Sequence, residues 1–114
     1  MMDRHMTDIK RLLEKLNITS SKARKSVLRN LSNREIKLLC EVCLNLVRGH
    51  LKISDRHTFK TLKRGRSTYT DLADKRKPLK EKRAIINQKG GFIGALAAAV
   101  LPIVISEVYH LFRK

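Results

Sequence analysis

The chain has 114 residues, which is room for one small domain and a tail, and an aromatic content of 4% without any Trp leaves only a thin core. Its 26 Lys and Arg exceed its 10 Asp and Glu, so the formal net charge is +16 and an anionic partner is expected, either nucleic acid or an anionic membrane. Catalysis is the function that this size and composition favour least. We expect a protein that is not an enzyme and holds no cofactor.

Two amphipathic helices are predicted at the start of the chain. The first covers residues 7–17, where four apolar side chains recur at helical spacing, namely Ile9, Leu12, Leu13 and Leu16. The second covers residues 18–31, begins at the cap-forming cluster Thr19-Ser20-Ser21 and has a weaker apolar stripe beside several basic residues. Each helix therefore has one apolar face to bury against a neighbour.

A third helix is predicted over residues 32–48. Ser32 and Glu35 have the spacing of a capping box, in which each side chain accepts a hydrogen bond from the other residue's backbone, and Gly49 is placed to end the helix. Together with the two helices before it, this helix predicts an all-α fold that starts with a small helical bundle over residues 1–50.

Residues 51–89 are predicted to form a basic, loosely packed segment that is helical in pieces. They hold thirteen Lys or Arg against four Asp or Glu, a net charge of +9. Ser54-Asp55 can cap a short helix that reaches Leu62, and residues 67–74 are compatible with a further turn or two. Pro78 stands at the expected start of another helix.

Lysines and arginines dispersed in this way suit a phosphate backbone, because each neutralised phosphate releases a condensed counterion. The alternative is an ordinary solvated surface, but a net charge of +16 favours the binding of nucleic acid. No base-reading helix, zinc module or stacking aromatic is evident, so binding is expected to be independent of base sequence. The residues predicted to contact phosphates are Lys60, Lys63, Arg64, Arg66, Lys75, Arg76, Lys77, Lys80, Lys82 and Arg83.

Cys40 and Cys43 form a C-x-x-C pair, which a structural zinc would have to complete with two further ligands. His50 and His57 follow at spacings that no common zinc module uses, so no metal site is predicted and both thiols are expected to pack in the core. Two cysteines make no disulfide framework, and the first residues lack the apolar stretch of a signal peptide. Both features favour a reducing compartment.

Residues 90–114 form the third predicted region, a glycine junction followed by an apolar helical tail. The apolar run Phe92–Ile105 is too short to span a bilayer as a helix, and a longer span would have to admit Glu107 and His110. Pro102 is expected to interrupt a helix here, because it removes one backbone donor and clashes with the carbonyl four residues before it.

The junction between the basic and apolar parts reads Gln88-Lys89-Gly90-Gly91-Phe92. A protease with a narrow cleft selects glycines on the acyl side, because a β-carbon would collide and only an extended chain fits. This pattern matches that of the adenovirus-type maturation protease, which cuts after the second glycine. Gln88, Lys89, Gly90, Gly91 and Phe92 are therefore the predicted cleavage site, and a flexible hinge or a helix stop is the alternative.

Taken together, the basic segment, the Lys-Gly-Gly-Phe junction and the small-residue tail resemble the adenovirus core protein X family, whose precursor yields a DNA-condensing peptide. The resemblance extends over nearly the whole chain to the X-like proteins of the adintovirus and Polinton/Maverick elements, including Cys40-Glu41-Val42-Cys43 and Leu46-Val47-Arg48-Gly49. It implies a protein that condenses double-stranded DNA and is located in the virion core and in the host nucleus. It also implies that a viral maturation protease releases residues 92–114.

Two other functions stay open. In the first, the tail lodges at a membrane surface while the cations of residues 75–89 sit on anionic headgroups. In the second, the chain is a small helical adaptor whose tail completes the core by packing on Leu39, Leu44 and Val47, so that loss of the tail would unfold the bundle. A folded bundle also leaves room for protein–protein contacts, including a homo-oligomer.

Overall fold

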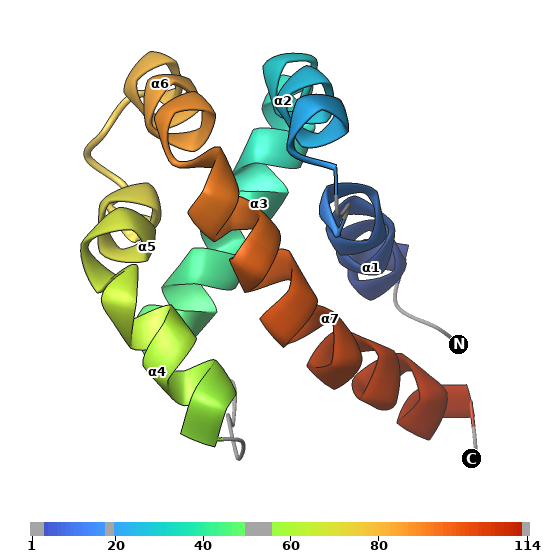
Figure 1. Ribbon diagram of the computed structural model, residues 1–114. Helices are drawn as coiled ribbons and strands as arrows, with labels where there is room; N and C mark the ends of the chain where they lie inside the picture. The colour runs from blue at the N-terminus through green and yellow to red at the C-terminus, as the bar shows by residue number, and fades with distance from the viewer. Residues whose placement is uncertain (1–3, 18–19, 50–55, 113–114) are drawn as a thin grey trace.

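The computed structural model describes residues 4–17, 20–49 and 56–112, and the side chains of its last helix as far as Ile105. The described residues form seven α-helices and no strand, which confirms the all-α prediction (Figure 1). In chain order these helices are α1 (Arg4–Leu16), α2 (Ser21–Arg29), α3 (Asn33–Val47), α4 (Arg56–Arg64), α5 (Arg66–Ala73), α6 (Leu79–Gln88) and α7 (Gly90–Phe112).

Local capping chemistry sets the ends of the N-terminal helices. The Ser32 hydroxyl accepts a hydrogen bond from the Glu35 backbone N–H at 3.1 Å, and the Glu35 carboxylate accepts one from the Ser32 N–H at 3.0 Å, which confirms the predicted capping box. Ser20 caps α2 through the Ala23 N–H. Gly49 follows α3 with a φ of +72°, a backbone conformation that favours glycine, and ends the helix as predicted.

The helices after residue 55 come in pieces, also as predicted. Gly65 separates α4 from α5, and Pro78 stands at the N-cap of α6. The segment is not loosely packed as predicted, because Leu62, Leu72 and Ile86 each bury a side chain in the core. The predicted cap at Ser54-Asp55 lies outside the described residues.

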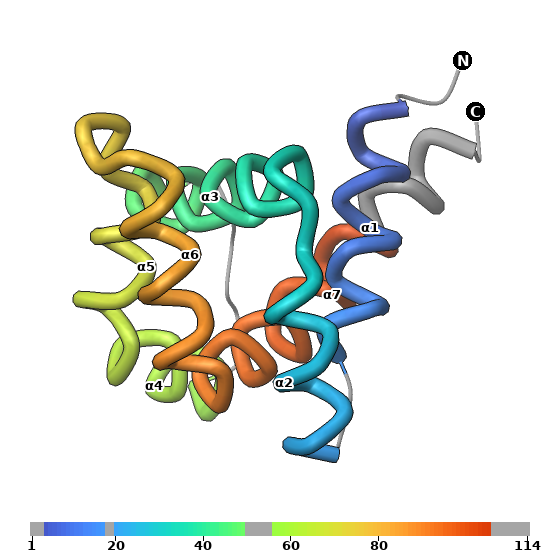
Figure 2. The backbone as a smooth tube through the Cα atoms, turned by 90° about the horizontal axis from the view of Figure 1, so that it is seen from above, coloured from blue at the N-terminus to red at the C-terminus, as the bar shows by residue number. Residues whose placement is uncertain are grey.

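The helices surround a common centre. Figures 1 and 2 show α1 and α2 on one side and α4, α5 and α6 on the other, with α3 and α7 crossing between them on opposite faces. The α5 helix runs along α3, and α7 packs against α1, α2, α4 and α6. The overall extents of 41 × 32 × 30 Å show that no helix stands away from the rest.

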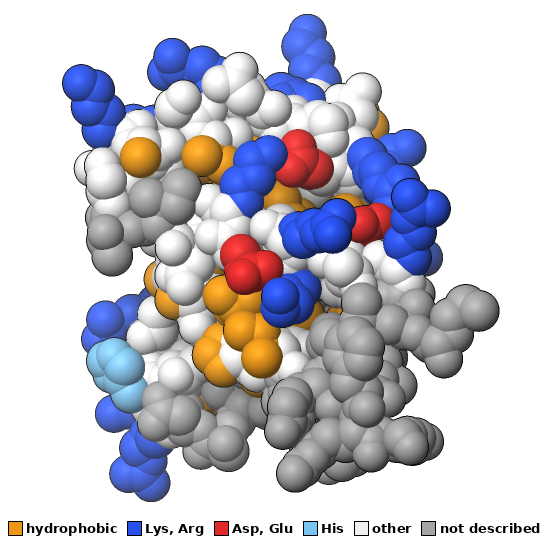
Figure 3. Space-filling model, turned by 90° about the vertical axis from the view of Figure 1, so that its right-hand side faces the viewer, with side chains coloured by type: hydrophobic (Ala, Val, Ile, Leu, Met, Phe, Trp, Pro, Cys, Tyr) orange, Lys and Arg blue, Asp and Glu red, His pale blue; other side chains and the backbone are white. Residues whose placement is uncertain are grey.

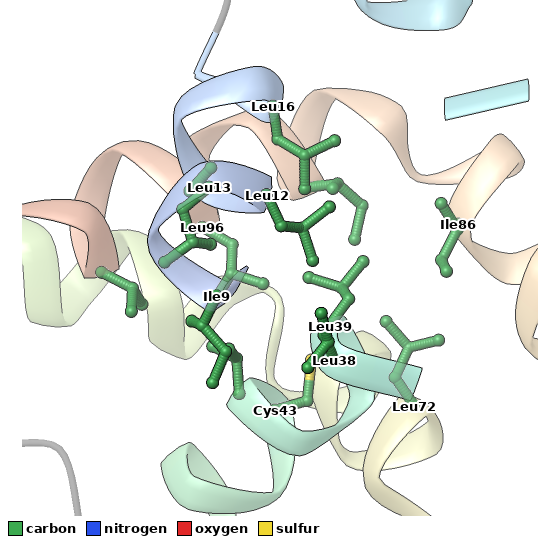
Figure 4. Close-up of a cluster of buried hydrophobic side chains, with 14 of the residues drawn as sticks. Ile9, Leu12, Leu13, Leu16, Leu38, Leu39, Cys43, Leu72, Ile86 and Leu96 are labelled. Carbon is green, nitrogen blue, oxygen red and sulfur yellow. The ribbon is translucent and has the colours of Figure 1, made fainter. Parts of the chain in front are cut away.

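One hydrophobic cluster joins all three predicted regions of the chain. Figure 4 shows Leu13 of α1 beside Leu96 of α7, within a cluster that also contains Leu39 of α3 and Leu72 of α5. The side chains that are almost completely buried are Leu13, Leu16, Leu28, Ile36, Leu39, Cys43, Leu72, Ile86, Ile93, Leu96 and Val100. The ranges 1–50, 51–89 and 90–114 therefore differ in charge and composition, but they share one core.

The apolar tail differs from the separable segment that its composition predicts. Ile93, Leu96, Ala97 and Val100 have no exposed surface, so α7 is a central helix of the fold. This agrees with the adaptor hypothesis, in which the tail completes the core. Of the three predicted partners, Leu39 and Leu44 belong to the same hydrophobic cluster as α7, whereas Val47 does not. Val47 stays 47% exposed, because α7 packs mainly along α1.

The prediction that Pro102 interrupts the helix is wrong. The α7 helix continues from Gly90 to Phe112 with Pro102 inside it and exposed. A proline inside a helix costs about 3 kcal/mol. The burial of Leu101 and Val104 on either side of it offsets that cost, since each buried aliphatic side chain contributes about 1.5–3 kcal/mol.

Candidate nucleic-acid interface

Acidic side chains on α1 and α3 are paired with neighbouring basic side chains. The pairs are Asp8 with Arg34, Glu14 with Lys10, Glu35 with Lys15, and Glu41 with His5. Three of these four pairs join α1 to α3 and hold the two helices in register. On the face seen in Figure 3, which looks at the molecule from the side of α1 and α2, acidic side chains accordingly lie among basic ones.

Two other helices contain basic residues but no acidic residue. The α2 sequence contains four Lys or Arg and no acid, and the α4 sequence contains Arg56, Lys60, Lys63 and Arg64 and no acid. All four α4 cations are exposed. Because no carboxylate of either helix can neutralise them, these surfaces keep a positive potential that attracts polyanions.

The predicted phosphate-binding residues divide into two groups. The exposed members are Lys60, Lys63, Arg64, Arg66, Lys75, Arg76 and Lys80, and the half-buried members are Lys77, Lys82 and Arg83. Lys60, Lys63 and Arg64 share one side of α4 by their helical spacing. Lys63 and Arg66 line the same groove at the start of α5. The others lie on α6 and on the connection before it.

Arg83 has a structural partner that the sequence does not reveal. Its guanidinium donates one hydrogen bond to the Leu31 carbonyl oxygen at 2.8 Å and another to the Asn33 side-chain oxygen at 3.0 Å. These bonds tie α6 to the turn between α2 and α3. Arg83 is therefore already engaged within the protein and is a poorer phosphate ligand than predicted.

Arg76 is also paired within the chain. Its Nε donates to Asp74 at 3.1 Å, and these hydrogen bonds lower the pKa of the Asp74 carboxyl and raise the pKa of Arg76. The Arg76 side chain is 91% exposed, while that of Asp74 keeps 25% of its surface accessible. A pair with one partner in water contributes little to stability.

Three predicted residues line a cleft between α3 and α6. Lys75, Lys77 and Lys82 surround a space of about 420 Å³, and Lys37 of α3 completes the rim. Its floor is apolar and consists of Cys40, Leu44, Ala73 and Leu79, and one acidic residue, Glu41, also lines it. None of the four lysines has an ion-pair partner in the part of the chain that the structure describes.

The structure adds residues that the sequence reasoning missed. Lys22, Lys25 and Arg29 of α2 are exposed, and the absence of any acid from residues 21–29 was the available signal. Phe59 is the second omission. It is 54% exposed within the cationic α4 surface, where no stacking aromatic was expected.

The two cysteines pack as predicted. Cys43 is completely buried, Cys40 is half-buried, and both thiols are free. Burial raises the pKa of each thiol, which keeps it protonated and unreactive. The described residues contain no group of three or more His, Cys, Asp or Glu that could hold a metal ion. His50 lies outside those residues, and His57 is exposed on α4.

The predicted cleavage site is folded. Gln88 ends α6, Lys89 connects the helices, and Gly90-Gly91 form the first residues of α7, with Gly91 exposed. The Phe92 ring packs against the backbone of Gly65 and stacks on Tyr69 at a centroid distance of 6.4 Å. The helix-stop alternative therefore describes this structure, because an extended chain would require the start of α7 to unwind.

A membrane span finds limited support in the geometry. No single helix among the described residues is both long and apolar enough to cross a bilayer. Only α6 taken together with α7 as far as Ile105 passes by length and composition, and that pair is bent by 91°. Membrane attachment through the tail stays a prediction.

Comparison with known proteins identifies no relative. No protein-family model, curated protein or solved structure matches the chain.

Proposed function

We propose that this protein binds double-stranded DNA without base-sequence preference, through contacts between its Lys and Arg side chains and the phosphates. The observation that carries the proposal is the exposed α4 surface, on which Arg56, Lys60, Lys63 and Arg64 have no acidic neighbour on their own helix. Elsewhere, five carboxylates of the described residues are paired with basic side chains, namely those of Asp8, Glu14, Glu35, Glu41 and Asp74. The excess charge is thus concentrated where a polyanion can reach it.

Several physical arguments support phosphate recognition over base reading. Counterion release rewards any cation that neutralises a phosphate, whatever the base beside it. The α4 and α6 helices have only 9 and 10 residues, and their cations are the flexible side chains of Lys and Arg. The α4 helix contains no Asn or Gln to read base edges. In α6, Arg83 and Asn87 already donate hydrogen bonds within the protein.

The biological setting in this proposal is a virion core. It rests on the resemblance to the core protein X family, in which such proteins condense the genome. Cleavage after Gly91 belongs to the same proposal, but it requires a local change in the fold. The protease must meet the chain after the first turn of α7 has unwound and Phe92 has left Gly65.

The experiment that tests the proposal is a salt titration of DNA binding. Fluorescence anisotropy with two unrelated duplexes is expected to give equal affinities and a steep linear fall of log K with log salt. Lys60→Gln, Lys63→Gln and Arg64→Gln together are expected to make that slope shallower, by up to about 0.9 for each phosphate that the protein no longer neutralises.

A control on α1 removes the same number of charges from elsewhere. Arg4→Gln, Lys10→Gln and Arg11→Gln together are expected to leave the slope close to that of the unmodified protein. Equal changes of slope in the two triple variants would mean that only net charge matters. A strong preference for one duplex, or an affinity that does not change with salt, would contradict the proposal.

A further inference from the structure

The exposed aromatic side chain of α4 lies in a cationic setting. Arg56, Phe59, Lys60 and Lys63 follow at positions i, i+3, i+4 and i+7, so they share one face of the helix. All four are exposed, and Phe59 keeps 54% of its surface accessible. Among the aromatic side chains that the structure describes, Phe59 is the exposed one, since Tyr69 and Phe92 are half-buried.

A groove opens beside this ring. It has a volume of about 320 Å³ and runs between the end of α3, α4 and the start of α5. Phe59, Leu46 and Tyr69 supply its apolar surface, and Lys63 and Arg66 supply its charge. No Asp or Glu among the described residues lines it. The groove thus offers an aromatic face next to two cations.

We propose that this groove binds an unpaired nucleobase of a single-stranded nucleic acid. The Phe59 ring stacks on the base, and Lys60, Lys63 and Arg66 hold the phosphates on either side of it. Stacking on an aromatic side chain beside cations is the usual way in which proteins hold single strands, because every base has a π-face. The inference rests on the proposed function, since it names a second form of nucleic acid for the same cationic surface.

Charge and shape disfavour two other occupants. A second copy of the chain would bring a helix with four cations against an equally cationic one. Duplex DNA satisfies Lys60 and Lys63 but leaves Phe59 unused, because the faces of its bases are stacked on one another. An unpaired base, by contrast, uses the ring and the cations together.

The absence of Trp from the chain makes a direct test possible. Phe59→Trp provides a single fluorophore at the proposed stacking position, and Ala84→Trp places one at an exposed alanine of α6, beside other predicted phosphate contacts. Oligothymidylate is expected to quench Phe59→Trp strongly and Ala84→Trp weakly. A duplex of equal length is expected to quench neither strongly.

Affinity supplies the second readout. Phe59→Ala is expected to weaken binding to oligothymidylate by about tenfold while leaving duplex binding within about twofold, and Phe59→Trp is expected to keep the affinity of the unmodified protein. Because Phe59 is exposed, the alanine variant should keep its fold, which circular dichroism checks.

Each outcome is decisive. Unchanged oligothymidylate affinity in Phe59→Ala, or equal quenching at both Trp positions, overturns the inference and leaves the duplex proposal standing. Failure to bind either nucleic acid overturns the proposed function itself. A blue shift on adding an acidic leucine-containing peptide, without any response to oligothymidylate, means that the groove takes a peptide and also overturns the inference.

Discussion

At the scale of single residues, the packing around Phe92 shows how closely two distant parts of the chain depend on each other. Gly65 separates α4 from α5, and the Phe92 ring of α7 occupies the space where a side chain at residue 65 would stand. Gly91 lies next to Phe92 in sequence, yet nothing comes within 4 Å of the position of its missing β-carbon. A side chain at residue 65 would therefore collide with Phe92, whereas one at residue 91 has room.

This contrast gives a matched pair of substitutions. Gly65→Ala is expected to lower the free energy of unfolding by about 1–3 kcal/mol, because the added methyl group displaces the Phe92 ring. Gly91→Ala is expected to leave that free energy unchanged or raise it by up to about 1 kcal/mol, since alanine favours the helix. Urea denaturation followed by circular dichroism measures both. A decrease at Gly91 as large as the decrease at Gly65 would show that Phe92 is not seated as described.

The residue scale also shows what the sequence could not predict about the interface. Lys60 and Lys63 are exposed, as a charged residue in a polar stretch is by default, and their contact with phosphate stays a prediction. Arg83 was assigned to phosphate, although it donates to Leu31 and Asn33, about fifty positions earlier in the chain. Nothing in the sequence near Arg83 reveals partners at that distance.

At the scale of helices, prediction succeeded where local chemistry decides. The Ser32–Glu35 capping box and the positive φ of Gly49 belong to short-range patterns, so both ends of α3 were found from a few adjacent residues. The prediction for α7 failed because no short-range pattern marks how this helix packs. From Gly90 to Ile105 it has no polar residue to mark an outer face, so its sequence could not show which side meets α1.

Glu35 joins the cap of α3 to α1, which makes the stability of this pair of helices depend on pH. Burial alone would raise the pKa of Glu35, but hydrogen bonds from Lys15, at 2.8 Å, and from Ser32 outweigh that effect and lower the pKa below 4.5. The contribution of the carboxylate to stability is therefore present above about pH 4.5 and is lost as the pH falls through the lowered folded-state pKa.

Glu35→Gln is expected to remove that contribution while keeping a side chain that can still cap. The variant should lose about 1 kcal/mol of unfolding free energy near pH 7, and the difference from the unmodified protein should disappear toward pH 3. Glu14→Gln is the control, because its pair with Lys10 is exposed and contributes little. A destabilisation at Glu35 that persists unchanged at pH 3 would assign it to packing rather than to charge.

At the scale of the whole molecule, charge and packing divide the chain differently. Charge separates a cationic middle from an apolar end, and that division follows directly from composition. The packing of the helices does not follow that division, since α7 packs against α1, α2, α4 and α6. The DNA-binding surface proposed on α4 is consequently held in place by the segment that the proposed maturation step removes.

This dependence predicts that a chain ending at Gly91 cannot keep its fold. The truncation removes Ile93, Leu96, Val100 and Leu101, whose burial contributes about 1.5–3 kcal/mol each, and the total is comparable with the entire stability of a small domain, about 5–15 kcal/mol. Thermal melting followed by circular dichroism is expected to show a cooperative transition for the full chain and none for residues 1–91. Ala98→Ser in the full chain changes only an exposed position of α7 and should melt as the unmodified protein does. If residues 1–91 melt cooperatively at the temperature of the full chain, α7 is an appendage, and cleavage after Gly91 would free a folded DNA-binding domain rather than an unfolded polycation.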